Sequence, residues 1–132
     1  MTAYPTTEDE VREHAGKVLG FDKIDPSIAK AGVGQITTLK QLGFNSEGAA
    51  LKPDGWYLPR DRGLPAIVLE TKAHDSIAID SPALKTQVER YCNVIRTRYD
   101  IVIGIVYDGE QVRAYLNSKP LDVSDELQPA QY

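Results

Sequence analysis

The sequence predicts an α/β protein in which a mixed β-sheet is flanked by helices. Two segments, 7–20 and 81–99, carry apolar residues at the spacing of amphipathic helices. Two other segments, 65–72 and 101–107, are apolar on both alternating faces, as in strands that are covered on each side. Turn signals predict a hairpin around each of these strands, so the second helix is expected to cross over between strands of one sheet.

The length and composition of the chain are those of one globular domain. It has 132 residues, of which 42% are hydrophobic and 26% are charged. No apolar run approaches the roughly 20 residues that span a bilayer, and the first residues lack the basic and apolar regions of a signal peptide. The single cysteine, Cys92, excludes an internal disulfide and a cysteine-based zinc site. We therefore expect a soluble, cytoplasmic protein that makes no membrane contact.

The net charge restricts the possible partners. Fifteen Lys and Arg residues against 19 Asp and Glu residues leave a charge of -4. A protein that binds nucleic acid alone, through many phosphate contacts, is usually basic. Either nucleic acid is not the partner, or other domains of a larger protein supply the basic surface.

The first helix is predicted to begin near Thr7. Thr7 and Glu10 have the spacing of a capping box, and Gly20 stands where a C-terminal cap is expected. At 100° per residue, Glu8 falls inside the apolar stripe of this helix. The stripe comprises Val11, Ala15, Val18 and Leu19. A carboxylate on that face either compensates the helix dipole or serves a function.

The middle of the chain changes from loops to strands. Four glycines interrupt residues 25–51, which are expected to form one or two short helices and loops. A short strand is predicted at 52–58, and a loop rich in turn residues joins it to the strand at 65–72. Because side chains alternate along a strand, Glu70 and Lys72 are expected to point to the same face.

The last third of the sequence predicts a helix followed by a hairpin. Ser81–Pro82 opens the helix, which is expected to run to about Tyr99. Its apolar stripe comprises Leu84, Val88, Tyr91, Ile95 and Tyr99. The strand at 101–107 is followed by the tight-turn pair Asp108–Gly109, and residues 111–116 are expected to return beside it.

One group of residues has the chemistry of a metal-assisted hydrolase. A hairpin of the predicted length brings the Asp54 carboxylate beside Glu70 and Lys72. Two carboxylates and the Thr71 carbonyl are hard oxygen ligands of the kind that hold Mg²⁺. A lysine on the same strand face can activate a water molecule and stabilise charge on a phosphate. Together these groups suffice for hydrolysis of a phosphodiester.

The same residues resemble the PD-(D/E)xK nuclease superfamily. The PD pair stands at 53–54 and the ExK triplet at 70–72. Gln87 and Tyr91 match the QxxxY pattern on the following helix, as in RecB-type nucleases and the N-terminal nuclease domain of type I restriction-enzyme R subunits. The resemblance implies a restriction-endonuclease-like fold in which Gln87 and Tyr91 position Lys72 or the scissile phosphate.

The resemblance also assigns roles at the start of the chain. Residues 7–12 look like the first helix of those R-subunit domains, where an early glutamate contributes to the site. The resemblance therefore implies that Asp54 and Glu70 are ligands of Mg²⁺ or Mn²⁺, with Glu8 as an added carboxylate. It makes Lys72 the catalytic lysine.

The similarity covers about residues 7–117 and implies a function for the whole chain. We expect residues 1–132 to form a single nuclease-like domain, the N-terminal domain of a longer protein. Its activity would be Mg²⁺-dependent DNA endonuclease activity in a restriction-modification system. DNA and other domains or subunits of the restriction-modification complex would be its partners. The motor of an R subunit is missing, because no GxxxxGK[ST] phosphate loop occurs in the sequence.

Each motif residue also has an ordinary structural reading. Asp54, between a proline and a glycine, could be a turn residue. Glu70 and Lys72 could form an exposed ion pair, although the apolar run around them predicts burial. Gln87 and Tyr91 could be packing residues at helical spacing.

Other polar residues give weaker signals. His74 and Asp75 follow the ExK triplet, but two further matching ligands are missing from their surroundings in the sequence, so we interpret them as loop residues. Cys92 is expected to be a small core residue. Four basic residues flank the predicted site in sequence, namely Arg60, Arg62, Lys85 and Arg90.

Two functions of different classes therefore remain open. The first is the endonuclease. The second is a catalytically silent module of the same fold that docks or positions nucleic acid within a larger modification or helicase protein. The acidic net charge favours the silent module, whereas the intact set of Asp54, Glu70 and Lys72 favours the enzyme. A nuclease that acts on RNA or on DNA ends is a third possibility.

Overall fold

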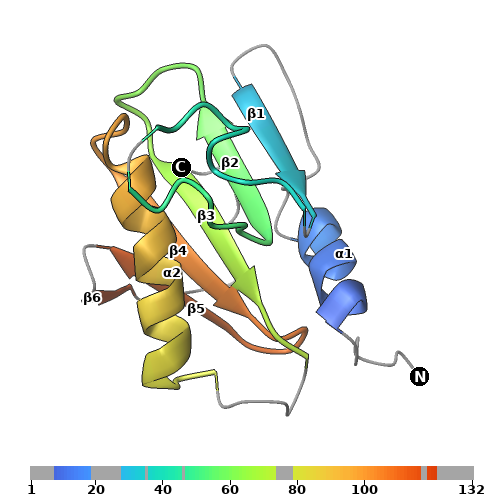
Figure 1. Ribbon diagram of the computed structural model, residues 1–132. Coiled ribbons are helices and arrows are strands. Elements are labelled where there is room, and N and C mark those ends of the chain that lie inside the picture. Colours follow the sequence, from blue (N-terminus) through green and yellow to red (C-terminus); the bar gives the residue numbers. More distant parts are fainter. Residues whose placement is uncertain are drawn as a thin grey trace.

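The structure is a mixed β-sheet with one helix on each face. The computed structural model describes residues 8–18, 28–34, 36–45, 47–73, 79–116 and 119–121. These residues contain a six-stranded sheet in the order β1-β2-β3-β4-β5-β6. The strands are β1 (Ile28–Val33), β2 (Gly55–Pro59), β3 (Ala66–Thr71), β4 (Val102–Tyr107), β5 (Val112–Leu116) and β6 (Lys119–Leu121). β3 and β4 are parallel, and the other neighbouring pairs are antiparallel (Figure 1). The predicted fold class, a mixed α/β sheet flanked by helices, is confirmed.

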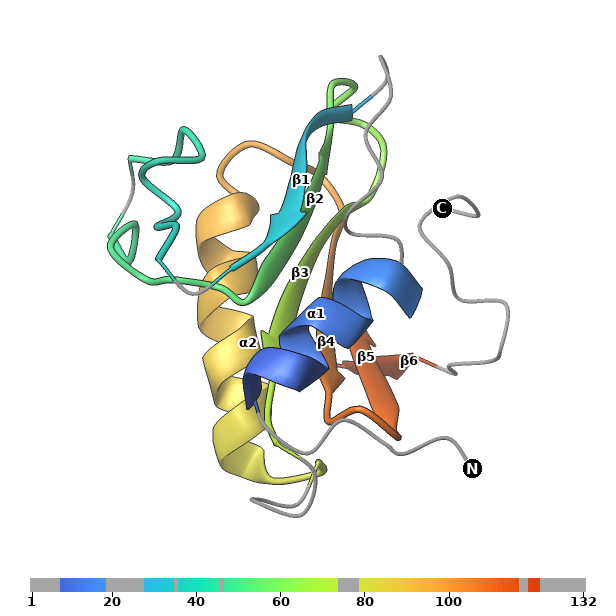
Figure 2. The same ribbon diagram turned by 90° about the vertical axis from the view of Figure 1, so that its right-hand side faces the viewer.

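The helices α1 (Glu8–Val18) and α2 (Pro82–Ile95) lie on opposite sides of the sheet, which is seen nearly edge-on in Figure 2. α2 connects the parallel strands β3 and β4, as the sequence predicts. Neither helix is long and apolar enough to cross a membrane, a finding that applies to the described residues.

The central strand β3 is apolar on both faces because each face packs against a helix. Val68 belongs to the core cluster that contains Val88 of α2. Ile67 and Leu69 belong to the cluster that contains Val11 of α1. All five side chains are fully buried. At about 25 cal/mol per Å² of buried apolar surface, these two layers supply most of the driving force for folding.

Local sequence signals set the start of α2, but not its end. The Ser81 hydroxyl accepts a hydrogen bond from the backbone N–H of Ala83 at 3.2 Å, and Pro82 occupies the first turn. The helix ends at Ile95, four residues before the predicted end. Tyr99 is buried nevertheless, because a turn after Arg96 folds it back onto the core.

The start of the chain agrees with its prediction where it is described. Val11 and Ala15 are fully buried against the sheet, as the apolar stripe of α1 requires. The predicted caps Thr7 and Gly20 lie outside the described residues, as does the side chain of Glu8.

The prediction of short helices within 25–51 is wrong for the part of that segment that is described. Residues 28–33 form the strand β1, and residues 39–45 and 47–50 form turns and irregular backbone. The β1 sequence IAKAGV has little β-branched or aromatic character, so its conformation comes from pairing with β2. Gly32 faces Trp56, where a Cβ would lie 3.2 Å from the indole ring.

The hairpin of β4 and β5 is confirmed. Asp108 is buried, and its carboxylate accepts hydrogen bonds from the backbone N–H groups of Glu110 and Gln111 at 2.9 and 2.7 Å. Gly109 has a φ of 94°, which favours glycine at that position. β6 extends the sheet by pairing with β5 and has no counterpart in the sequence prediction.

Gly104 in β4 gives a test of the packing between α2 and the sheet. A Cβ at this position would lie 2.9 Å from the Sγ of Cys92 and 3.0 Å from a methyl carbon of Val88. We expect Gly104→Ala to lower the free energy of unfolding by about 1–3 kcal/mol through overpacking. Gly34→Ala is the matched control, since its nearest contact there is 3.7 Å. Urea denaturation that gives equal stability for both variants would contradict the packing.

A candidate carboxylate site at the end of β3

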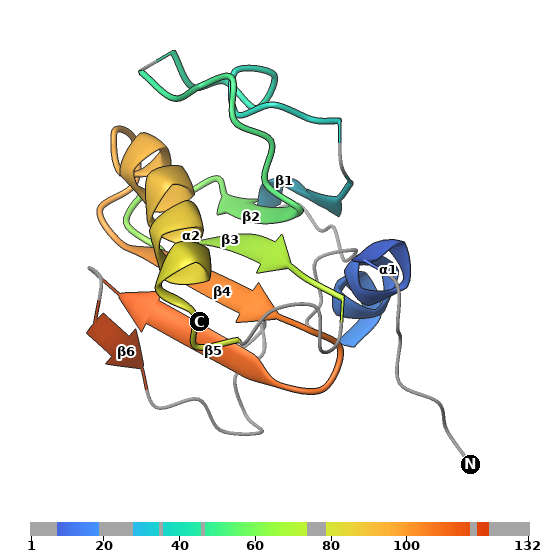
Figure 3. The same cartoon turned by 60° about the horizontal axis from the view of Figure 1, so that its bottom comes forward.

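Asp54 and Glu70 lie at the same corner of the sheet. The paired segment of β2 and β3 has Gly55 opposite Leu69, and the two acidic residues come next beyond this pair. Each is only 6% exposed. Figure 3 shows that the arrowhead of β3 points toward α1 at this corner. The structure therefore brings together the carboxylate positions that the PD and ExK motifs supply.

The Asp54 carboxylate is held by two groups. Its Oδ1 accepts hydrogen bonds from the Nε and Nη2 of Arg12, at 3.2 and 3.1 Å. Its Oδ2 accepts one from the backbone N–H of Thr71, at 2.8 Å. These contacts join α1, the start of β2 and the end of β3. Asp54 is therefore more than a turn residue.

Arg12 is the residue of this corner that the sequence prediction missed. Its side chain is 9% exposed and forms a buried ion pair with Asp54. The available signal was the helical spacing: Arg12 lies three residues before Ala15, so it falls on the core-facing side of α1. A buried guanidinium there requires a carboxylate partner from elsewhere in the fold.

Glu70 lies against Tyr91 of α2. The Tyr91 hydroxyl is 3.4 Å from both carboxylate oxygens of Glu70 and 3.4 Å from the carbonyl oxygen of Lys52. The Nε2 of Gln87 donates to the same hydroxyl at 2.9 Å. Since the hydroxyl carries one proton, it donates to one of these three acceptors at a time. The QxxxY pair therefore reaches the site through Glu70.

Both carboxylates act electrostatically on Tyr91. Burial raises the pKa of its phenol well above the usual value, and the negative charge of Glu70 and, to a smaller extent, that of Asp54 raise this pKa further. The hydrogen bond from Gln87 acts in the opposite direction. Tyr91 therefore stays protonated at neutral pH and acts as a hydrogen-bond donor in the site.

Lys72 and Glu8 complete the predicted set. Lys72 follows β3 directly, its side chain is half-buried, and its backbone N–H donates to the carbonyl oxygen of Tyr107 at 3.1 Å. Glu8 is the first residue of α1, and its side chain lies outside the described residues. His74 and Asp75 are likewise outside them.

The donor chemistry at this corner fits a hard divalent cation. Each carboxylate oxygen has two lone pairs, so the bonds from Arg12 and Thr71 leave Asp54 with capacity for a cation. The described residues contain no group of three or more His, Cys, Asp or Glu side chains suited to a metal. Mg²⁺ is often bound by only one or two carboxylates together with water and substrate phosphates. Asp54 and Glu70 are the residues that would hold it.

Burial tests two of the structural interpretations made from the sequence, those of Glu70 and Cys92. Glu70 is buried, so the reading of Glu70 and Lys72 as an exposed surface pair is wrong. Cys92 is fully buried in the core, as predicted, and burial raises the pKa of its thiol to about 12.

The basic residues near the motif in sequence are dispersed in space. β2 runs away from Asp54, so Arg60 and Arg62 lie in the loop at the opposite end of the sheet. Lys85 on α2 lies with its Nζ 5.6 Å from the centroid of the Tyr115 ring, and Arg90 is exposed on the same helix. Comparisons of the chain with models of known protein families, with curated proteins and with solved structures found no match.

Proposed function

We propose that this chain is a Mg²⁺-dependent DNA endonuclease domain of a restriction-modification system, resembling the nuclease domain of type I R subunits. The observation that carries the proposal is the burial of Asp54 and Glu70 at one corner of the sheet, directly before Lys72. Two buried carboxylates in one place favour the binding of a cation. Arg12 forms an ion pair with Asp54 at this corner.

The residues of the chain have separate roles in this proposal. Asp54 and Glu70 would bind the cation, which supplies Lewis-acid stabilisation of a phosphodiester. Tyr91, oriented by Gln87, would hold the Glu70 carboxylate in place by hydrogen bonding. Lys72 would stabilise the negative charge that develops on the phosphate during attack by water.

Thr71, the residue between Glu70 and Lys72, carries a buried hydroxyl. The Oγ1 of Thr71 is buried and has no hydrogen-bond partner among the described residues. Such orphaned groups are uncommon and are usually satisfied by water or an ion. Thr71 also holds Asp54 through its backbone N–H, so the unsatisfied oxygen belongs to a residue of the site.

The Arg12–Asp54 ion pair favours a second candidate, the catalytically silent module for docking or nucleic-acid positioning. A guanidinium 3.1 Å from Oδ1 already compensates the Asp54 charge, which reduces the need for a metal ion. One experiment distinguishes the endonuclease from the silent module. Incubation of supercoiled plasmid with the chain and Mg²⁺ at low salt is expected to give nicking that Glu70→Gln removes. Intact metal binding without nicking would assign the silent module.

Calorimetry measures metal binding by Asp54 and Glu70 directly. Mn²⁺ titrated into the chain in a calorimeter should bind weakly, and Asp54→Asn or Glu70→Gln should each lower its affinity by roughly tenfold or more. Glu70→Gln preserves the shape of the side chain and its contact with Tyr91. Asp80→Asn is the control, since Asp80 is an exposed carboxylate paired with Arg113 at 2.8 Å. Unchanged Mn²⁺ affinity in both site variants would refute the assignment.

A further inference from the structure

A second polar site lies at the opposite end of the sheet from the carboxylates. It is a pocket with a volume of about 230 Å³. Arg62 at this pocket accepts a backbone hydrogen bond from Asp100, just before β4, whereas Lys72 bonds to Tyr107 at the end of β4. At about 3.3 Å per residue, the length of β4 separates the two sites by roughly 17 Å. The pocket is therefore distinct from the proposed catalytic corner.

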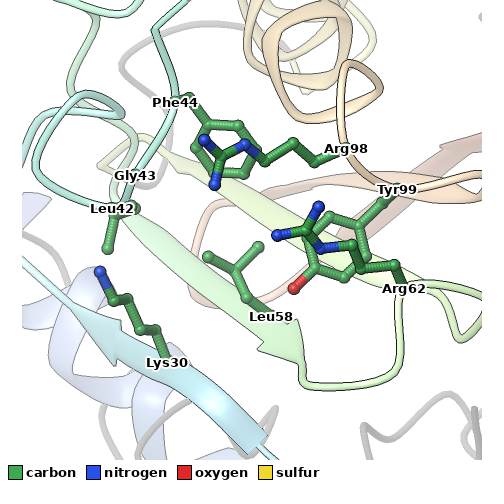
Figure 4. A pocket seen from close by; sticks show the side chains of 8 residues that line it. All are labelled: Lys30, Leu42, Gly43, Phe44, Leu58, Arg62, Arg98 and Tyr99. Carbon is green, nitrogen blue, oxygen red and sulfur yellow. The ribbon is translucent and has the colours of Figure 1, made fainter.

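Three cations from separate parts of the chain converge on this pocket. Lys30 comes from β1, Arg62 from the loop between β2 and β3, and Arg98 from the turn after α2. Figure 4 shows their side chains arranged around Leu58 and the ring of Tyr99. The described residues that line the pocket include no carboxylate. The fold thus builds a cationic pocket from residues far apart in sequence.

Neighbouring groups contact two of these cations, Arg98 and Lys30. The guanidinium carbon of Arg98 lies 5.7 Å from the centroid of the Phe44 ring, within the range of a cation–π contact. The Nζ of Lys30 donates to the carbonyl oxygen of Gln41 at 3.4 Å. The Tyr99 hydroxyl donates to the Pro59 carbonyl oxygen. Two of the three cations and the Tyr99 hydroxyl therefore have contacts within the protein.

Both arginines are close enough to Tyr99 to act on it electrostatically. Burial raises the pKa of its phenol, and the positive charges of Arg62 and Arg98 partly offset this rise. Both guanidinium groups therefore lie near the Tyr99 side chain, which lines the pocket.

Like charges gathered around one pocket repel one another, and a bound anion relieves that repulsion. All three cationic residues are exposed, so solvent and salt screen part of the effect. The chain as a whole is acidic, with a net charge of -4, so the cluster does not follow from a basic composition. Asp61, the carboxylate next to Arg62 in sequence, accepts the backbone N–H of Gly63 at 2.9 Å and closes its own loop.

We propose that the pocket lined by Lys30, Arg62 and Arg98 binds a phosphate monoester dianion. A phosphate monoester carries about -1.5 to -2 charges at pH 7, which matches three cations better than the single charge of a carboxylate or a phosphodiester. The volume exceeds that of a bare anion, and Phe44 and Leu58 supply apolar wall for an attached organic group. The phosphate belongs either to a free nucleotide or to the phosphorylated end of a nucleic acid strand.

The test is calorimetry on the whole chain in EDTA, which removes any contribution of a cation at Asp54 and Glu70. Inorganic phosphate and adenosine 5′-monophosphate are expected to bind, and adenosine is not. Arg62→Met and Arg98→Met should each weaken binding of the monophosphate by roughly tenfold or more. Arg60→Met, an exposed arginine of the same loop outside the pocket lining, should bind like wild type.

A second titration, with a phosphorylated oligonucleotide, distinguishes the two sources of phosphate. Tighter binding of a 5′-phosphorylated hexanucleotide than of the monophosphate indicates a strand end, and the reverse order indicates a free nucleotide; either result supports the pocket. The proposal is overturned if the monophosphate does not bind, if adenosine binds equally well, or if both arginine variants bind like wild type. Thermal melts of the variants verify that they are folded.

Discussion

Replacement of Lys72 by alanine is expected to lower DNA cleavage by roughly 10²-fold or more while leaving metal binding intact. Lys72 follows Glu70 and Thr71 at the end of β3, so its side chain starts from the same corner of the sheet as both carboxylates. It does not belong to the oxygen ligand set. The loss should therefore appear in the chemical step and not in the affinity for Mn²⁺.

The measurement is single-turnover cleavage of a short DNA duplex with protein in excess, at low salt and with Mn²⁺. Excess protein compensates for the weak duplex binding that we expect from an acidic chain. Lys40→Ala, at an exposed turn residue, is the matched control and should cleave at the wild-type rate. Equal rates for Lys72→Ala and wild type would end the assignment of a catalytic lysine.

Loss of the Arg12 guanidinium is expected to cost about 3–5 kcal/mol of the free energy of unfolding. Arg12→Met retains the apolar stem but leaves Asp54 as a buried carboxylate without its charged partner. Both side chains are less than 10% exposed, so water cannot replace the lost contact without local rearrangement. Urea denaturation followed by circular dichroism measures the change.

A double-mutant cycle separates the ion pair from general damage to α1. The combination of Arg12→Met and Asp54→Asn should be less destabilised than the sum of the two single variants, because it removes both charges together. Arg90→Met, an exposed arginine on α2, should change stability by no more than about 0.5 kcal/mol. A similarly small effect of Arg12→Met would show that the pair contributes nothing to stability.

The sequence predicted the elements that carry strong local signals. β3 and β4 are apolar on both faces, α2 begins with a Ser–Pro cap, and the Asp108–Gly109 turn closes a hairpin. These features depend on side-chain alternation, helical spacing and turn chemistry, which act over a few residues. The same reasoning placed Asp54 and Glu70 at the end of one hairpin, where the structure has them.

The elements that were missed have weak local signals and depend on partners. β1 lacks the composition of a strand and exists because β2 offers an edge to pair with. β6 is three residues long and pairs with β5 in the same way. α2 ends at Ile95, yet Tyr99 is buried by a turn whose position depends on the core beneath it.

The sequence by itself determined the class of fold, the two-sided burial of β3 and the chemistry of the motif residues. Only the tertiary structure decided which charges meet. Arg12 contacts Asp54, from which it is separated by 42 positions of sequence. Arg62 is near the motif in sequence but lies with Lys30 and Arg98 at the other end of the sheet. The physical reason is that local periodicity fixes which face a side chain occupies, whereas its partner across the sheet depends on strand order and register.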